Sequence, residues 1–152
     1  MTARDVMTRD VVTVSPNATA REAAELMRQH GHAALPVVDE HGRMLGMFSE
    51  ADLLRLALPK YLEDIGDLSF LPDDFEPFEH PRQETKTARV RDLLSRTEVP
   101  VAEPDDHVAE VARIICEHGV RRVPIVENGK LVGIVTRADL IERIVLPTLL
   151  EG

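Results

Sequence analysis

Residues 120–139 read VRRVPIVENGKLVGIVTRAD, a pattern of strand, tight turn, strand and helix start. Two short apolar runs flank Asn128-Gly129, and this dipeptide in such a setting is the strongest short-range signal for a β-hairpin. The second apolar run ends at Thr136, where a helix is expected to open. The stretch therefore predicts a two-stranded hairpin that leads directly into a helix.

The same pattern occurs earlier in the chain, at residues 34–52. An offset of 88 residues superposes Gly31 and Pro36 on Gly119 and Pro124. The offset becomes 87 from Gly42 onward, because the turn of the first hairpin is one residue longer. A fixed internal period identifies a repeat architecture, so the chain is a duplicated unit of roughly 55 residues.

Each copy predicts the element order β-α-β-β-α. A brief strand, at 11–14 or 99–102, precedes an amphipathic helix, at 19–30 or 106–118, and the hairpin and a second helix follow. A unit this small cannot bury both faces of its sheet and helices alone. The predicted architecture is thus an α/β (α+β) fold in which two copies pack about a pseudo-twofold axis.

The long helix of each copy carries more apolar positions than one buried face needs. Gly31 and Gly119 are expected to end these helices as left-handed caps. Leu26 and Ile114 fall on a second face of the helices, which predicts burial against a further partner. The C-terminal segment adds further apolar residues: Leu140, Ile141, Ile144, Val145 and Leu149. Together these positions predict a homodimer.

Composition and charge narrow the class of protein. With 152 residues, 43% hydrophobic and 30% charged, the chain has the composition of a globular protein. It contains no apolar run of about 20 residues and no signal-peptide pattern, and a single cysteine, Cys116, so we expect a cytoplasmic protein without internal disulfide or membrane span. The net charge of −9 argues against nonspecific nucleic-acid binding.

An acidic insert separates the two copies. We expect three parts, a first repeat at 1–57, the insert at 58–88 and a second repeat at 89–152. Residues 61–80 hold seven acids and no Lys or Arg. The insert also holds four of the five aromatic residues of the chain: Tyr61, Phe70, Phe75 and Phe78. Because disordered linkers are poor in aromatics, we favour packing of these rings on their own subunit; the alternative is a contact with a partner or neighbouring subunit.

A Ser/Thr-x-x-Asp motif recurs at the same place in both copies. It comprises Ser49 and Asp52 in the first copy, and Thr136 and Asp139 in the second. One interpretation is a capping box, in which the hydroxyl and the carboxylate satisfy free backbone N–H groups. The other is a binding site at a helix start, where the Asp holds a ribose diol and the hydroxyl and N–H groups hold a phosphate.

With these motifs the two copies resemble a tandem pair of CBS domains. The sequence Val-Pro-Ile-Val, the Gly-bearing hairpin and Gly-Ile-Val-Thr-x-x-Asp carry the resemblance, which covers both repeats but not the insert. The resemblance implies a regulatory module that binds an adenosyl ligand, AMP, ADP, ATP or S-adenosylmethionine, in clefts between the repeats. It also implies homodimers that form through helices, and a regulated partner protein that the sequence does not identify.

The resemblance further implies which residues hold the ligand. Asp139 would hold ribose hydroxyls, and Thr136 the ribose or a phosphate. The adenine would lie against four residues of the partner repeat: Val11, His32, Ala33 and Pro36. The mirror cleft would use a corresponding set: Ser49, Asp52, Val99, Val120, Arg121 and Pro124.

Arg121 and Arg122 stand before the Pro of the second copy, where the first copy has Ala33 and Ala34. The planar guanidinium makes paired, charge-assisted bonds to phosphate, so at least one of these arginines is expected to contact it. The alternative is a pair of solvated charges. We therefore expect the cleft headed by Asp139 to bind a phosphorylated ligand more tightly than the cleft headed by Asp52.

No pattern of an enzyme is present. The sequence has no Walker loop, metalloprotease motif or Ser/His/Asp signature, and His30-x-His32 lacks the further ligands of a closed metal site. We therefore predict no enzyme, no metal site and no required cofactor. The leading hypothesis is a ligand-sensing regulatory module, and the alternative is a structural dimerisation module with vestigial clefts that bind nothing.

Overall fold

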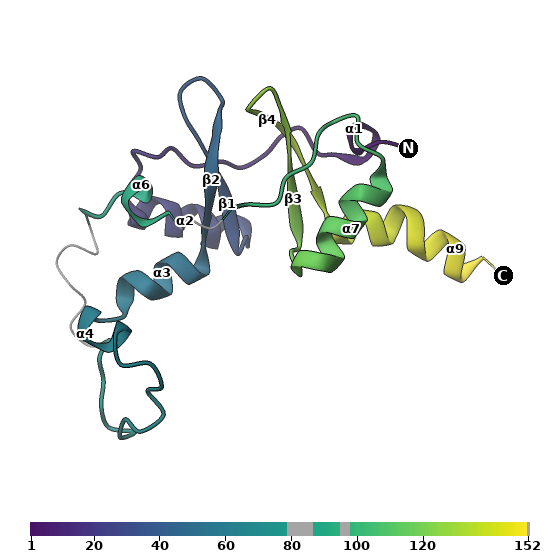
Figure 1. Ribbon diagram of the computed structural model, residues 1–152. Helices are drawn as coiled ribbons and strands as arrows, with labels where there is room; N and C mark the ends of the chain where they lie inside the picture. Colours follow the sequence, from purple (N-terminus) through teal and green to yellow (C-terminus); the bar gives the residue numbers. More distant parts are fainter. Residues whose placement is uncertain (79–86, 95–97, 152) are drawn as a thin grey trace. The chain divides into compact units, whose positions relative to one another are not determined.

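The computed structural model describes residues 1–78, 87–94 and 98–151 (Figure 1). These residues form two compact units built from non-consecutive segments. Unit 1 comprises residues 1–13, 38–45 and 97–152, and unit 2 comprises residues 14–37 and 46–96. Each unit therefore combines segments from both copies of the repeat.

Unit 1 contains a hairpin, a long helix and a helical C-terminal segment (Figure 1). Its elements are α1 (Ala3–Val6), α7 (Val108–His118), β3 (Arg122–Glu127), β4 (Lys130–Thr136), α8 (Arg137–Leu140), the π-helical η1 (Ile141–Val145) and α9 (Leu146–Leu150). Strands β3 and β4 pair antiparallel, with Arg122 opposite Thr136. Asn128 and Gly129 between them have φ angles of 54° and 81°, as a tight hairpin turn of this type requires. The predicted hairpin is confirmed.

The N-terminal helix α1 packs within unit 1 on residues of the second copy. Ala3 N donates a hydrogen bond to the Asp106 carbonyl at 2.8 Å, and Arg4 N donates to the Pro104 carbonyl at 2.9 Å. Ala3 and Val6 are buried in the same core as α7 and β3. The lead-in of the first copy thus completes the core of the second.

The residues after α1 lie directly on β4. Thr8 and Ile134 exchange two backbone hydrogen bonds, of 2.8 and 2.9 Å. A Cβ atom at Gly133 would lie 2.6 Å from the Met7 Sδ and 3.0 Å from the Thr8 carbonyl oxygen. Glycine at position 133 is therefore what allows the N-terminal segment to approach β4 so closely.

Unit 2 repeats this arrangement with the other lead-in. Its elements are α2 (Ala20–His30), β1 (Ala34–Val38), β2 (Met44–Ser49), α3 (Glu50–Ala57), α4 (Lys60–Glu63) and α6 (Val90–Leu93). Residues 38–45, which comprise the hairpin turn and the adjoining ends of β1 and β2, belong to unit 1. Val90 N donates to the Ala18 carbonyl at 2.9 Å, and Arg91 N donates to the Pro16 carbonyl at 3.0 Å. Helix α6 of the second copy therefore packs on first-copy residues, just as α1 packs on second-copy residues.

The first strand predicted in each copy, 11–14 and 99–102, is reduced to a single bridge residue. Ala102 N donates to the Pro124 carbonyl at 3.0 Å, but the ladder extends no further. Pro124 on one side and Pro104 on the other have no N–H group to donate to the next carbonyl. The mixed helix and strand fold is as predicted, whereas the length predicted for these strands was wrong.

The glycine caps are confirmed. The second apolar face of the helices is already covered, at least in part, by the protein itself. Gly31 and Gly119 have φ angles of 66° and 62°, in the left-handed region. Ile114 is buried in the core of unit 1, and Leu26 is half-buried. The interpretation of Ile114 as a contact for a further partner was wrong, because its own unit already covers it.

The aromatic rings of the insert are exposed, so the prediction that they pack on their own subunit was wrong. Phe70 is 66% exposed and Tyr61 is 61% exposed, and both other rings are exposed as well. Local turns hold this backbone, for example the bond from Phe75 N to the Pro72 carbonyl at 3.0 Å. Such turns order the chain without bringing its side chains to a core.

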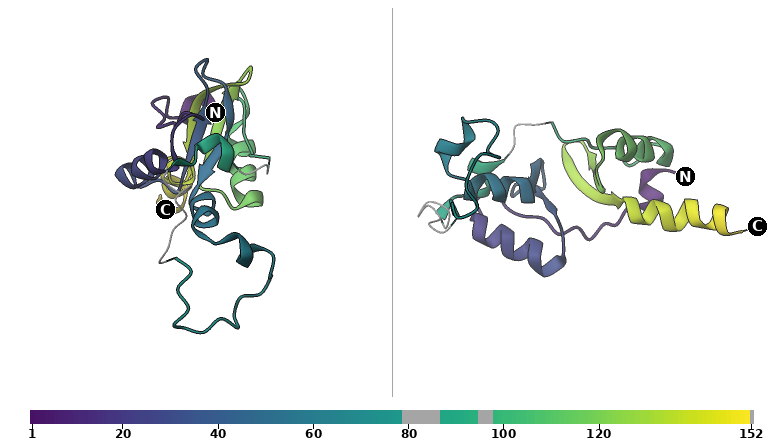
Figure 2. Two further views of the ribbon diagram at one scale, coloured as in Figure 1. Left: turned by 90° about the vertical axis from the view of Figure 1, so that its left-hand side faces the viewer. Right: turned by 90° about the horizontal axis from the view of Figure 1, so that it is seen from below.

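The C-terminal segment α8, η1 and α9 continues as one helical rod to the end of the described chain (Figure 2). Several of its large apolar side chains are exposed: Ile141, Val145, Leu146, Leu149 and Leu150. Leu140 is buried in unit 1. In the described part of the chain, no helix has the length and apolar character to cross a membrane.

We expect the two equivalent glycines to respond differently to substitution. Gly133→Ala should lower the free energy of unfolding by about 1–3 kcal/mol, because the new methyl group meets Met7 and the Thr8 backbone. Gly46→Ala is the matched control, since its Cβ would lie 3.7 Å from Leu94, an ordinary contact. Urea unfolding of both variants measures the difference, and equal losses would contradict this account of Gly133.

The exposure of the insert gives a second stability prediction. Phe48→Ala should lower the free energy of unfolding by about 3–5 kcal/mol, because the ring of Phe48 is fully buried. Phe70→Ala should change it by less than about 0.5 kcal/mol, as exposed substitutions do. Denaturant titration of the two variants tests this, and a loss at Phe70 comparable to that at Phe48 would mean that the ring is packed in solution.

Candidate ligand site

The site begins at the junction where β4 ends and α8 starts. Thr136 caps the helix, and its Oγ1 accepts a hydrogen bond from Asp139 N at 3.1 Å. Arg137 N donates to the Arg121 carbonyl at 2.8 Å. The Asp139 carboxylate takes no part in this cap, and within the described residues it accepts no hydrogen bond. Two carboxylate oxygens therefore remain as acceptors at the start of α8.

Arg122 lies directly across the hairpin ladder from Thr136 and is half-buried. Its Nε is buried, and no described residue accepts a hydrogen bond from it. Loss of water around the guanidinium lowers the pKa of Arg122, and the negative charge of Asp139 partly opposes that shift. A buried donor without a partner is costly, so an anion that met this nitrogen would be stabilised.

The corresponding junction in unit 2 is closed. Ser49 precedes α3, and the Asp52 Oδ2 accepts from Ser49 N at 2.8 Å and from Ser49 Oγ at 3.2 Å. The other oxygen of Asp52 accepts from the guanidinium of Arg55. Asp52 is the buried charged residue of the described core. The capping-box interpretation therefore fits Ser49 and Asp52, whereas Thr136 and Asp139 form only half of such a box.

The backbone geometry of the two junctions is otherwise the same. Glu50 N donates to the Ala33 carbonyl at 2.9 Å, just as Arg137 N donates to the Arg121 carbonyl. The difference lies in the side chains, since Ala33 stands where the second copy has Arg121. At this strand position the second copy therefore carries an arginine, and the first copy carries an alanine.

The predicted site residues divide between the two units. Unit 1 holds one group: Val11, Val99, Val120, Arg121, Arg122, Pro124, Thr136 and Asp139. Unit 2 holds the other: His32, Ala33, Pro36, Ser49 and Asp52. Of these residues, Arg121 and Ala33 are exposed, and Val11, Val99, Val120 and His32 are half-buried.

Two of the predicted residues have a clear role in the sheets. Pro36 and Pro124 are fully buried, and their carbonyls accept hydrogen bonds from Val14 N and Ala102 N, both at 3.0 Å. These contacts hold the segments that precede α2 and α7 against β1 and β3. A ligand contact for the two prolines stays a prediction.

A small pocket of about 140 Å³ lies in unit 1 on the side of the hairpin tips. It is lined by Arg9, Val11, Thr13, Val38, Gly42, Leu131 and Val132. Leu131 N donates to the Gly42 carbonyl at 3.1 Å beside it. Sites for drug-sized ligands measure about 300–1,000 Å³, so this pocket alone cannot enclose a nucleotide.

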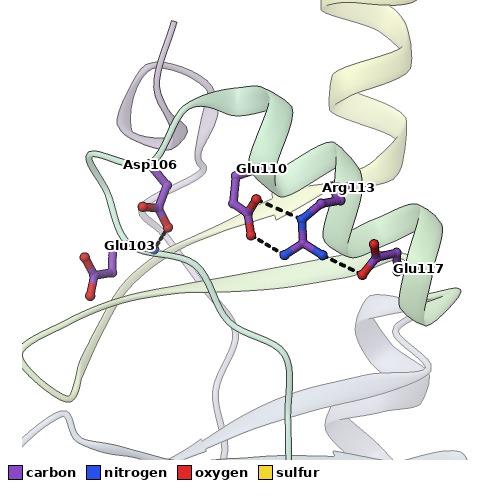
Figure 3. Close-up of polar contacts among 5 residues, drawn as sticks. All are labelled: Glu103, Asp106, Glu110, Arg113 and Glu117. Carbon is purple, nitrogen blue, oxygen red and sulfur yellow. Dashed lines mark hydrogen bonds and ion pairs between the residues drawn. The ribbon is translucent and has the colours of Figure 1, made fainter.

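Arginine is also present on the exposed face of α7, but it is committed to ion pairs (Figure 3). Arg113 Nε donates to Glu110 at 2.9 Å, and the same guanidinium pairs with Glu117. These bonds lower the pKa of Glu110 and raise that of Arg113. In the preceding turn, Asp106 accepts from Glu103 N at 2.8 Å. Arg113 thus donates hydrogen bonds to two carboxylates, whereas Arg122 donates none to a carboxylate among the described residues.

The histidine pair singled out in the sequence does not gather further ligands. The ring centroids of His30 and His32 lie 5.9 Å apart. Over residues 1–78, 87–94 and 98–151, no three His, Cys, Asp or Glu side chains come together as metal ligands.

Arg55, which contacts Asp52, was not among the residues identified from the sequence. It lies three residues after Asp52, and side chains at that spacing meet on a helix surface. This spacing was the signal that could have identified it. At the equivalent position, the second copy has Glu142.

Known proteins are similar to this chain in sequence. The chain is 35% identical to the CBS domain-containing protein YhcV of Bacillus subtilis, over 90% of this chain and 81% of that protein. Two further curated relatives are longer, and the chain spans 60% of one from Methanopyrus kandleri and 31% of one from Methanocaldococcus jannaschii.

Solved structures agree with the fold. A structure of CBSX2 in complex with AMP matches with a TM-score of 0.72 and 26% identity, over 97% of this chain and 98% of that one. The CBS domain pair of MJ0100, in complex with 5′-methylthioadenosine and S-adenosyl-L-methionine, matches with a TM-score of 0.66 and 25% identity, over 97% and 98%. The CBS domain family itself matches residues 3–58 and 90–146, on either side of the insert. The chain thus belongs to the CBS domain family and carries a tandem pair of its repeats.

Proposed function

We propose that this CBS pair is a regulatory module that binds an adenine nucleotide or another adenosyl compound and modulates a partner protein. AMP, ADP, ATP and S-adenosylmethionine are the ligands in question. The observation that carries the proposal is the group of Arg122, Thr136 and Asp139 at one helix start, with a buried guanidinium nitrogen that has no hydrogen-bond partner among the described residues.

The chemistry of these side chains suits a nucleoside phosphate. The Asp139 carboxylate accepts hydrogen bonds, and the two hydroxyls of a ribose donate them. Arg122 and the first N–H groups of α8 offer donors to a phosphate, and a guanidinium does so through paired bonds. Since α8 and η1 continue the same helical segment, the start of that segment also presents its positive dipole end.

Relatives support the same ligand class. CBSX2 was solved with AMP, and the MJ0100 pair with two adenosyl compounds. By similarity, we propose that this chain also binds an adenosyl compound, with its ribose at Asp139. A ligand that binds one arrangement of the repeats better than another would shift their equilibrium, which is how such a module would alter a partner.

The decisive experiment compares the two aspartates by isothermal titration of AMP. Asp139→Asn should weaken AMP binding by at least about tenfold, because hydrogen bonds to charged groups contribute about 1.5–3 kcal/mol. Asp52→Asn is the matched control and should leave most of the binding intact, since the Asp52 carboxylate is already occupied. If Asp52→Asn abolishes binding and Asp139→Asn keeps it, the site has been assigned to the wrong repeat.

The role of Arg122 is tested by comparing the affinities of two ligands, AMP and adenosine, which differ by the phosphate. AMP should bind more tightly than adenosine to the intact chain, and Arg122→Gln should reduce that preference. Equal affinity for AMP and adenosine would exclude Arg122 as a phosphate contact. Failure of AMP, ATP and S-adenosylmethionine alike to raise the melting temperature would favour the alternative, a dimerisation module without ligand.

We further propose that the chain forms a homodimer through its helical C-terminal segment. Light scattering at micromolar concentration should give twice the 17.0 kDa mass of one chain. Leu149→Asp should shift this mass toward the monomer, because Leu149 is 72% exposed in α9. Leu45→Asp, at an exposed position in β2, is the control and should keep the dimer. A monomeric intact chain would overturn the proposal.

A further inference from the structure

We propose that Arg55 determines which of the two repeats binds the adenosyl ligand, by occupying the carboxylate of Asp52 in the first repeat. The chain would then have one open site at Asp139 and one self-occupied site at Asp52. This inference rests on the proposed function, because it concerns the same ligand and the two equivalent helix starts.

Both carboxylate oxygens of Asp52 already accept hydrogen bonds. One carboxylate oxygen accepts two hydrogen bonds from Ser49, and the other accepts from Arg55. The Asp52 side chain is 1% exposed. A ribose diol needs carboxylate oxygens as acceptors, so it would have to displace Ser49 or Arg55.

Arg55 is the group that a ligand can displace. Its side chain is 54% exposed, so the guanidinium can turn into solvent and exchange its bond to Asp52 for bonds to water. The bonds from Ser49 are part of the cap of α3, and their loss would leave the backbone N–H of Ser49 without this acceptor. Arg55 therefore competes with the ligand, whereas Ser49 belongs to the frame of the site.

The second repeat lacks this competitor. Position 142, three residues after Asp139, carries an exposed Glu, which has no guanidinium to donate to the Asp139 carboxylate. Thr136 completes the cap of α8 through its own oxygen. Arg122 lies near enough to interact electrostatically with Asp139 but donates it no hydrogen bond among the described residues. The Asp139 oxygens are therefore available to a ribose.

Reciprocal exchange at the two equivalent positions tests the inference. AMP is titrated by calorimetry against the intact chain, Arg55→Gln, Glu142→Arg and the double variant. The intact chain should show one strong site per chain. Arg55→Gln should reveal a second site. The affinity of that site for AMP should rise about tenfold, because a charge-assisted competitor for Asp52 has been removed. Glu142→Arg should weaken the Asp139 site by a similar factor, and the double variant should reverse the order of the two sites.

Glu142→Gln is the matched control, since it removes the acid without adding a guanidinium and should not weaken binding. Because Glu142 is exposed, Glu142→Arg still decides the question if Arg55→Gln fails to fold. Two equal sites in the intact chain, an unchanged stoichiometry in folded Arg55→Gln, or an unchanged affinity in Glu142→Arg would each overturn the inference while leaving the proposed function standing. Absence of AMP binding in every variant would overturn the proposed function and this inference together.

Discussion

The chemistry of this chain depends on which group caps a helix that follows a hairpin. The first N–H groups of a helix have no partner within it and must find one nearby. At α8 the Thr136 hydroxyl oxygen fills that role, and the Asp139 carboxylate accepts no hydrogen bond among the described residues. At α3 the Asp52 carboxylate is drawn into the cap by Ser49 and held from its other side by Arg55. One backbone design therefore gives an open carboxylate in one copy and a fully used carboxylate in the other.

The second constraint is the close approach of the N-terminal segment to β4. Thr8 pairs with Ile134, and α1 completes the core on which α7 and β3 pack. This core holds Val123 and Val135, the residues that adjoin Arg122 and Thr136 along their strands. Arg122 is consequently fixed opposite Thr136, with its Nε withdrawn from water. Burying the Nε donor without an acceptor costs free energy, and the fold imposes this cost. An acceptor that is not among the described residues, such as a ligand, would remove it.

Local features of the fold could be predicted from the sequence, and features that depend on tertiary burial could not. The hairpin at Asn128-Gly129 and the cap at Gly119 were predicted correctly because each rests on the φ angle of one or two residues. The prolines that cut the first strands short were visible in the sequence, but the ladder they interrupt was not. The burial of Ile114 and the exposure of Phe70 depend on what the rest of the chain covers, which periodicity and composition do not specify. At the site, the Ser/Thr-x-x-Asp motif located both helix starts, but it is identical in pattern for the open and the occupied carboxylate.

A duplicated fold with unequal sites can do what two equal sites cannot. Two identical sites fill over the same range of ligand concentration, so the second adds capacity but no new threshold. When an internal arginine must be displaced first, the occupied site fills only at a higher concentration, and a tenfold difference in affinity corresponds to about 1.4 kcal/mol of competition. A hydrogen bond to a charged group contributes about 1.5–3 kcal/mol, slightly more than that amount, so one side chain three residues beyond the aspartate is sufficient to separate the two thresholds. The change from Arg55 to Glu142 at equivalent positions is therefore large enough, in free energy, to turn a symmetric repeat into a graded sensor.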